Sequence, residues 1–212
     1  MKINKLKRFS VLKRCMLVLS FAATAVATQN AAAMVAPGDV VKNTVNAIVN
    51  NIQKNRELYK TDNDALYKMV DETLVPAVHV PRMARLILGS YANSATPAQV
   101  EAFSKEFQVF LMRTYATALL EYTGNEKVVY LPVNLPEGSD RIVVEAQLIS
   151  ATGATYGINL HMSNRRDTQW RAFNIEVAGI NFISTYRATF KNTLDTKGVE
   201  GLIADLKSKN AN

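Results

Sequence analysis

The sequence predicts an α+β domain in which helices pack on one face of a curved antiparallel sheet of about four strands. Between residues 40 and 122, and again after residue 184, apolar residues recur every three or four positions, as along one face of a helix. Between those regions apolar and polar residues alternate, which is the period of a β-strand. The links between the alternating runs are short and polar, which favours an antiparallel meander. Helices, then one sheet, then helices is an α+β order.

The N-terminus has the features of a cleavable signal peptide. Six basic residues and no acidic residue lie within the first 14 positions, and the apolar run over residues 15–27 is too short to span a bilayer. Ala31-Ala32-Ala33 matches an A-x-A cleavage site, and Ala25-Val26-Ala27 is the alternative. We therefore expect residues 1–33 to be the signal peptide and residues 34–212 to be one exported domain.

The charge and the cysteine content of residues 34–212 exclude several classes of partner and site. The chain has 25 Lys and Arg and 18 Asp and Glu; without the six bases of the leader, the formal net charge is +1, which gives no basis for binding nucleic acid. The single cysteine, Cys15, lies in the leader, so the exported domain has no thiol for a disulfide, a metal site or a nucleophile.

Helices are expected over residues 37–59, 62–74 and 80–89, the last with Pro81 in its first turn and Gly89 just past its end. Thr96-Pro97-Ala98-Gln99 then has the spacing of a capping box. The helix that follows is expected to continue to residue 122 with a wide aromatic and aliphatic stripe.

Strands are expected over residues 126–133, 141–149, 155–162 and 170–177, because apolar side chains alternate within each run. A closing helix over residues 184–210 is expected to be interrupted at Gly198.

The sequence offers few groups for catalysis or for a cofactor. His79 and His161 have no acidic neighbour at metal-ligand spacing, and neither a phosphate-binding glycine loop nor a nucleophile elbow occurs. We therefore expect neither catalytic residues, nor a metal, nor a cofactor. The apolar stripe and the apolar sheet face fit either a filled core or a lined cavity, because periodicity alone does not separate the two.

Several arginines have two interpretations. Arg165 and Arg166 lie in an expected hairpin turn, where exposed charge is ordinary, but the pair also suits docking to an acidic partner or a phosphate. Arg82 and Arg85 flank apolar residues and are either solvated or at the rim of a pocket.

Three ordered blocks resemble the MlaC family of periplasmic phospholipid-binding proteins, also called toluene-tolerance proteins. They are LVPAVHVPRMARLILG at residues 74–89, ATPAQ at 95–99 leading to RTYA and LEY, and WRAFNIEVAGI at 170–180 continuing into Tyr186 and Phe190. The resemblance covers the chain from about residue 41 to the C-terminus. His79, Asn174 and Ala178 depart from the family pattern, in which acids are common at these positions.

The resemblance implies an NTF2-like core with added helices that encloses an apolar cavity. It implies a periplasmic carrier, not an enzyme, that shuttles phospholipid and maintains outer-membrane lipid asymmetry. The implied partners are an outer-membrane lipoprotein complex and an inner-membrane ABC transporter complex with its lipid-binding ring subunit. We expect a monomer. The alternatives are an isomerase or dehydratase on a cone-shaped α+β fold, and a periplasmic protein-binding adaptor with a filled core.

On this resemblance the acyl chains lie between the long helix and the sheet, with Leu86 and Leu88 near the entrance. The residues expected to touch lipid are Leu86, Leu88, Phe103, Phe107, Leu111, Tyr115, Val144, Tyr156, Ile158, Leu160 and Trp170. The residues expected to dock partners are Arg82, Arg85, Arg165 and Arg166.

Overall fold

The computed structural model describes residues 34–165 and 167–211, and Met34–Asn212 form one compact unit. The predicted signal peptide and Arg166 lie outside the described residues. Among the residues described, no helix is both long and apolar enough to cross a membrane.

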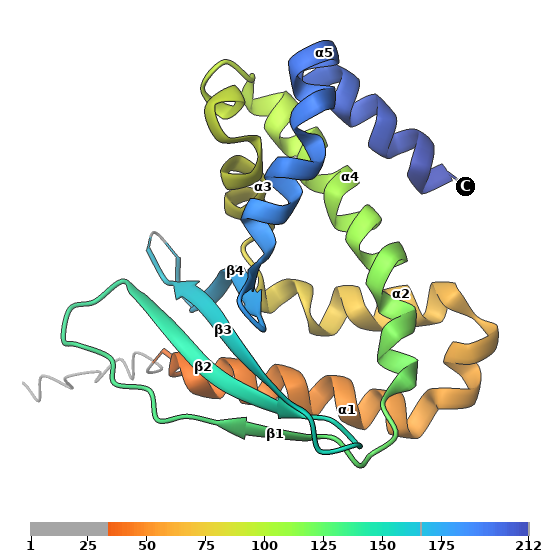
Figure 1. The fold of residues 1–212 in the computed structure, drawn as a ribbon, viewed down its shortest axis with the longest axis vertical. Coiled ribbons are helices and arrows are strands. Elements are labelled where there is room, and N and C mark those ends of the chain that lie inside the picture. Colours follow the sequence, from red (N-terminus) through yellow and green to blue (C-terminus); the bar gives the residue numbers. More distant parts are fainter. Residues whose placement is uncertain (1–33, 166, 212) are drawn as a thin grey trace, which may run out of the picture. The chain divides into compact units, whose positions relative to one another are not determined.

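The element order confirms the predicted α+β class, with one open antiparallel sheet and helices before and after it (Figure 1). The helices are α1 (Pro37–Thr61), α2 (Asn63–Thr73), α3 (Val80–Leu88), α4 (Pro97–Tyr115) and α5 (Phe182–Ala211), with short 3-10 helices η1 (Val75–Ala77), η2 (Gly89–Asn93) and η3 (Ala116–Glu121). The strands are β1 (Lys127–Tyr130), β2 (Arg141–Ile149), β3 (Thr155–Ser163), β4 (Arg171–Val177) and β5 (Ile180–Asn181).

The sheet has five strands rather than about four, because β5 adds a two-residue edge. Ala178 and Gly179 join β4 to β5, and both have a positive φ, of 50° and 79°. Such a two-residue turn suits the twist of a hairpin, and glycine adopts it at low cost. The alternation of apolar and polar residues predicted strands only up to residue 177, so β5 was not predicted.

The local signals for the helix ends are confirmed. Thr96 and Gln99 form a reciprocal capping box at the start of α4. Gly89, with φ 58°, follows the last residue of α3, and Gly198 breaks the helical geometry within α5. The long helix differs from prediction: α4 ends at Tyr115, and the chain continues to Glu121 as the tighter η3.

The described residues form three hydrophobic clusters, one of which packs α1 and α2 against η3 through Ile52, Leu66 and Ala116. Helices α3, α4 and α5 bury a cluster of aromatic and aliphatic side chains, centred on Phe103 and Phe107. Helix α1 runs along the sheet, where Val41 packs with Val144, Met162 and Trp170 (Figure 1). The sheet face was predicted to lie opposite the long helix, but around Val144, Met162 and Trp170 it is covered by α1.

Candidate functional site

A cavity of about 350 Å³ lies where the α2–α3 segment and α4–η3 face strands β3 and β4. Its lining includes members of all three hydrophobic clusters, such as Met83, Val70 and Ala172. Its lining residues are Val70, Leu74, Val75, Val78, Val80, Met83, Gln108, Leu111, Met112, Tyr115, Ala116, Leu119, Leu160, Ala172, Ile175 and Phe182.

Helical spacing and strand register explain why these side chains converge. Leu111, Tyr115 and Leu119 follow one another at intervals of four, so they share one side of α4 and its continuation η3. Leu160 of β3 and Ile175 of β4 are directly paired, so both side chains point to the same face of the sheet.

The cavity offers an apolar environment with two polar groups and no charged side chain among its lining residues. The Gln108 amide donates to Asp71 Oδ1 at 2.8 Å. The Tyr115 and Tyr186 hydroxyls lie 2.7 Å apart, and burial, followed by this neighbour, raises the pKa of Tyr186. Such a lining suits an uncharged, apolar ligand, because an isolated charge buried here would lack a partner.

The exposed side chains of Leu74 and Tyr115 mark where the cavity meets solvent. They are 37% and 49% exposed, although both line the cavity. Leu74 follows the last residue of α2, and Tyr115 is the last residue of α4. The opening of the cavity is therefore bordered by these two elements.

Of the eleven residues predicted to touch lipid, Leu111, Tyr115 and Leu160 line the cavity. The other eight lie elsewhere in the packed structure. Phe103, Phe107 and Leu88 are buried in the α3–α4–α5 cluster, and Leu86 packs against the edge of that cluster. Val144 and Trp170 pack beneath α1. Tyr156 and Ile158 lie in the first half of β3, where Tyr156 is exposed.

Sequence reasoning did not select most of the cavity lining. The spacing could have predicted Leu119, because this residue continues the four-residue interval from Leu111 and Tyr115. No spacing in the sequence predicts that Ile175 and Phe182 line the cavity, since their positions depend on how β4 and the start of α5 pack against the helices. The contributions of α2 and η1 come from a segment far from the sheet in sequence.

A smaller apolar hollow of about 180 Å³ lies between α1 and η3. It is lined by Val45, Ile48, Val49, Ile52, Leu119 and Tyr122. Leu119 lines both this hollow and the larger cavity, so its side chain separates two apolar spaces.

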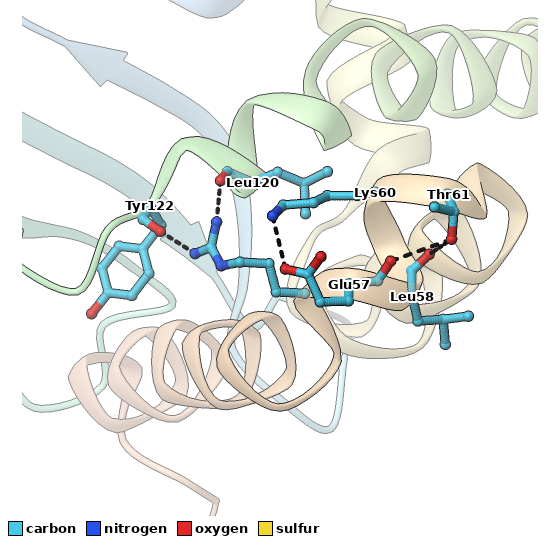
Figure 2. Close-up of polar contacts among 7 residues, drawn as sticks. Glu57, Leu58, Lys60, Thr61, Leu120 and Tyr122 are labelled. Atoms are coloured by element: carbon cyan, nitrogen blue, oxygen red, sulfur yellow. Dashed lines mark hydrogen bonds and ion pairs between the residues drawn. The ribbon is translucent and has the colours of Figure 1, made fainter.

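An arginine of α1 holds η3 in place beside that hollow. The Arg56 guanidinium donates to the backbone carbonyl oxygens of Leu120 and Tyr122, the two carbonyls that Figure 2 shows at the end of η3. These oxygens lie where a helix end leaves carbonyls without partners in the helix. On the neighbouring turn of α1, Glu57 and Lys60 form an exposed ion pair at 2.8 Å.

A second hollow, of about 410 Å³, brings together most of the arginines predicted to dock partners. Its lining residues are His79, Pro81, Arg82, Arg85, Arg141 and Arg165. Arg82 and Arg85 lie on α3, whereas Arg165 lies about 80 residues later in the turn after β3, so only the fold unites them. Arg141, at the start of β2, was not predicted.

The two histidines are explained by local structure. His79 Nδ1 accepts a hydrogen bond from the backbone N–H of Arg82 at 3.3 Å and so caps α3, and burial lowers its pKa. His161 lies 3.5 Å from a carboxylate oxygen of Glu176 on β4. Within the described part of the chain, no group of three His, Cys, Asp or Glu side chains is arranged to hold a metal ion.

Comparison with proteins of solved structure identifies a similar fold. The phospholipid-binding protein from Ralstonia solanacearum, solved in complex with a phospholipid, superposes with a TM-score of 0.74 at 24% identity, over 82% of this chain and 97% of that one.

Comparison of sequences identifies relatives along nearly the whole chain. The toluene tolerance protein ttg2D of Pseudomonas putida is 30% identical over 192 residues, which cover 89% of this chain and 85% of that protein. The intermembrane phospholipid transport system binding protein MlaC of Haemophilus influenzae is 26% identical over 200 residues, 92% of each chain. The model of the MlaC protein family matches residues 42–208, which include every described element from α2 to β5, and the chain therefore belongs to the MlaC family.

Proposed function

We propose that this protein is a periplasmic phospholipid carrier that holds acyl chains in the apolar cavity and transfers lipid between outer-membrane and inner-membrane Mla complexes. In this role it helps to maintain the lipid asymmetry of the outer membrane. The observation that carries the proposal is a cavity lined by aliphatic and aromatic side chains without a charge. The relatives named for phospholipid binding and transport support the choice of ligand.

The physical need for such a cavity follows from the size of the cargo. The two tails of a phospholipid contain roughly 30 methylenes, and at about 0.8 kcal/mol each their exposure to water costs on the order of 24 kcal/mol. A carrier in aqueous solution has to cover both tails throughout transfer. The charged head group has no partner among the cavity residues and is best accommodated outside, past Leu74 and Tyr115.

The cavity volume sets a condition on loading. An engineered apolar cavity of about 150 Å³ binds benzene, so about 350 Å³ accommodates a segment of an acyl chain rather than two complete tails. We infer that loading a whole phospholipid moves the helices away from β3 and β4, or displaces Leu119 and adds the hollow beneath α1. Docking to a membrane-bound complex is the natural moment for such a movement, because the tails then pass directly between apolar surroundings.

The two alternative functions fit the molecule less well. The MlaC family consists of binding and transport proteins, which confirms the prediction that the chain is not an enzyme. An adaptor with a filled core has no use for the cavity between α4 and the sheet. The proposed transfer needs neither a metal nor a cofactor.

Native mass spectrometry of the protein purified from a periplasmic extract, followed by lipid extraction, tests the proposal. We expect a stoichiometric adduct with the mass of a phospholipid. The variant Leu160→Trp places an indole in the cavity and should lower the fraction of protein molecules that carry lipid, while the domain remains folded. Val143→Trp is the matched control, because Val143 is 39% exposed and precedes by one position on β2 the residue Val144, which pairs with cavity-lining Leu160, so Val143 points to the opposite face of the sheet.

A protein without bound lipid that also captures none from vesicles would contradict the carrier function. Equal lipid occupancy in Leu160→Trp and in the control would place the tails outside this cavity.

A further inference from the structure

The cationic hollow is a charge arrangement that lipid storage does not explain. Among the residues that the structure describes, four guanidinium groups from α3, β2 and the β3–β4 turn surround a space of about 410 Å³, and no acidic side chain lines it. The exported domain as a whole has a net charge of only +1, so this local excess is not a general property of its surface. Like charges gathered at one place repel one another unless an anion occupies the space between them.

The carboxylates near the hollow neutralise only part of this charge. The Asp140 carboxylate oxygens lie 3.9 Å from Arg141 Nε and 3.5 Å from Arg165 Nε, so one carboxylate pairs with two arginines. Within the described residues, neither Arg82 nor Arg85 forms an ion pair with a carboxylate. Burial lowers the pKa of Arg82, and the nearby Arg141 lowers it further.

Arg82 is held in position by the sheet. Its guanidinium carbon lies 3.7 Å from the centre of the Phe173 ring, at the irregularity between β3 and β4. Stacking on an aromatic ring restricts the guanidinium and leaves its N–H groups free to point into the hollow. A donor that is already oriented loses less conformational entropy when it binds an anion.

The hollow is distinct from the apolar cavity, since the two share no lining residue. Helix α3 separates them: Val80 and Met83 line the cavity, whereas Arg82 and Arg85 line the hollow. A phospholipid whose tails fill the cavity through the opening at Leu74 and Tyr115 therefore has its head group at another place. The anion that suits the hollow belongs to a second molecule.

The shape and the lining of the hollow favour the carboxylates of a protein over a bilayer. In the part of the chain that the structure describes, none of the exposed large hydrophobic side chains lines the hollow, which gives it no apolar group to insert into a membrane. The hollow is open to solvent, so protruding carboxylates can enter it. Arginine pairs with carboxylates through two parallel hydrogen bonds.

We propose that this hollow docks an acidic segment of a partner protein, one that presents Asp or Glu side chains to Arg82, Arg85, Arg141 and Arg165. The inference rests on the proposed carrier function, in which the protein meets partners at both membranes. Exposed ion pairs are individually weak and are screened by salt, which suits a contact that forms and breaks in every transfer cycle.

Binding of a fluorescein-labelled hexaglutamate peptide, measured by fluorescence anisotropy, tests the proposal, with hexaglutamine as the neutral comparison. The triple variant Arg85→Gln, Arg141→Gln, Arg165→Gln removes three exposed charges and keeps the Arg82–Phe173 contact that supports the fold. We expect about ten-fold weaker binding of hexaglutamate, since each exposed ion pair contributes modestly. The wild-type affinity should fall as salt is raised.

A control variant has the same change in net charge at a distance from the hollow. Lys54→Gln, Arg113→Gln, Lys127→Gln alters three exposed residues that do not line it. We expect this control to bind the peptide as the wild type does. Equal loss in both variants, or none in the first, would overturn the proposal, and so would binding to phosphatidylglycerol vesicles or inorganic phosphate without binding to the peptide.

Lipid occupancy of the same samples separates this proposal from the carrier function. By native mass spectrometry, the triple variant should hold as much phospholipid as the wild type, because its substitutions lie outside the cavity. If the wild type holds no lipid, the carrier function fails whatever the peptide does. If lipid is held and the peptide result does not depend on the three arginines, the docking site alone fails.

Discussion

Helix α4 and its continuation η3 carry one apolar stripe, but the two halves of this stripe have different surroundings. In the first half, Phe103 and Phe107 are fully buried among α3, α4 and α5. In the second half, Leu111, Tyr115 and Leu119 line a cavity of about 350 Å³. The same spacing thus leads to a filled core at one end and to an open cavity at the other.

The side chains across from the stripe account for the difference. Opposite the first half, α5 provides Phe182, Tyr186 and Phe190, whose ring centres lie 5.1 to 6.3 Å from that of Phe107. Opposite the second half, the sheet provides the aliphatic side chains of Leu160, Ala172 and Ile175, and of the three α5 rings Phe182 alone extends to the cavity lining. Large rings fill the space between elements, whereas smaller side chains leave part of it open.

The two halves are also held by different interactions. Aromatic packing fixes the first half, and its energy depends on buried area. The second half packs against α1 and α2 through a smaller, mostly aliphatic cluster that buries Ala116. Polar contacts add to this packing: Arg56 donates to the end of η3, and the Tyr115 and Tyr186 hydroxyls meet. A filled core supplies stability, while a cavity with polar restraints at its border retains room for ligand.

The largest effect is expected from Phe107→Ala in the filled half. Phe107 is fully buried and contacts five aromatic rings, so its removal should lower the free energy of unfolding by about 4 kcal/mol, measured by urea denaturation. Val143→Ala, on the exposed face of β2, should change stability by less than about 0.5 kcal/mol. Loss of lipid from Phe107→Ala without loss of stability would show that the two halves are not distinct.

Arg56→Ala should have the next largest effect. It leaves two carbonyl oxygens at the end of η3 without their charged donor, which should cost about 2 kcal/mol. Amide hydrogen exchange should rise first in residues 116–122, because these lose their anchor to α1. Lys54→Ala, an exposed neighbour on α1, serves as the control and should leave exchange in that segment unchanged.

A matched pair of Leu→Ala variants compares the two surroundings directly. Leu88 is 1% exposed in the filled region, and its truncation should cost about 3 kcal/mol. Leu119 borders two open spaces, so its truncation removes fewer contacts and should cost about 1.5 kcal/mol. Lipid occupancy should persist in Leu119→Ala; equal destabilisation of the two variants would argue against an open second half.

Tyr115→Phe should have the smallest effect. It removes a hydroxyl that lies 2.7 Å from that of Tyr186, at a side chain that is 49% exposed, and should cost about 0.5 kcal/mol. A double-mutant cycle with Tyr186→Phe measures the coupling between the two hydroxyls. Zero coupling would mean that this contact does not restrain the border of the cavity.

Much of the fold could be predicted because its signals are local. The capping box at Thr96, the end of α3 at Gly89 and the interruption at Gly198 each depend on a few neighbouring residues. Strand β2 was predicted to its ends, since alternation is unambiguous when one face is buried. The two-residue β5 and the change from α4 to η3 were not predicted, because neither has a distinct periodicity.

The site was only partly predictable, for a related reason. Periodicity selected Leu111, Tyr115 and Leu160 together with residues of the filled core, because it indicates which side chains point inward and not what they meet. Likewise, four arginines spread over residues 82–165 gave no indication that they surround one hollow.

The sequence by itself determined the α+β class, the helix boundaries set by caps and glycines, and the apolar faces of helices and strands, because all of these depend on interactions within a few residues. Only the tertiary structure decided which part of the α4–η3 stripe is filled and which part lines the cavity, and where the arginines converge. Those outcomes depend on the volumes and charges of side chains brought together from distant segments, which no local spacing encodes.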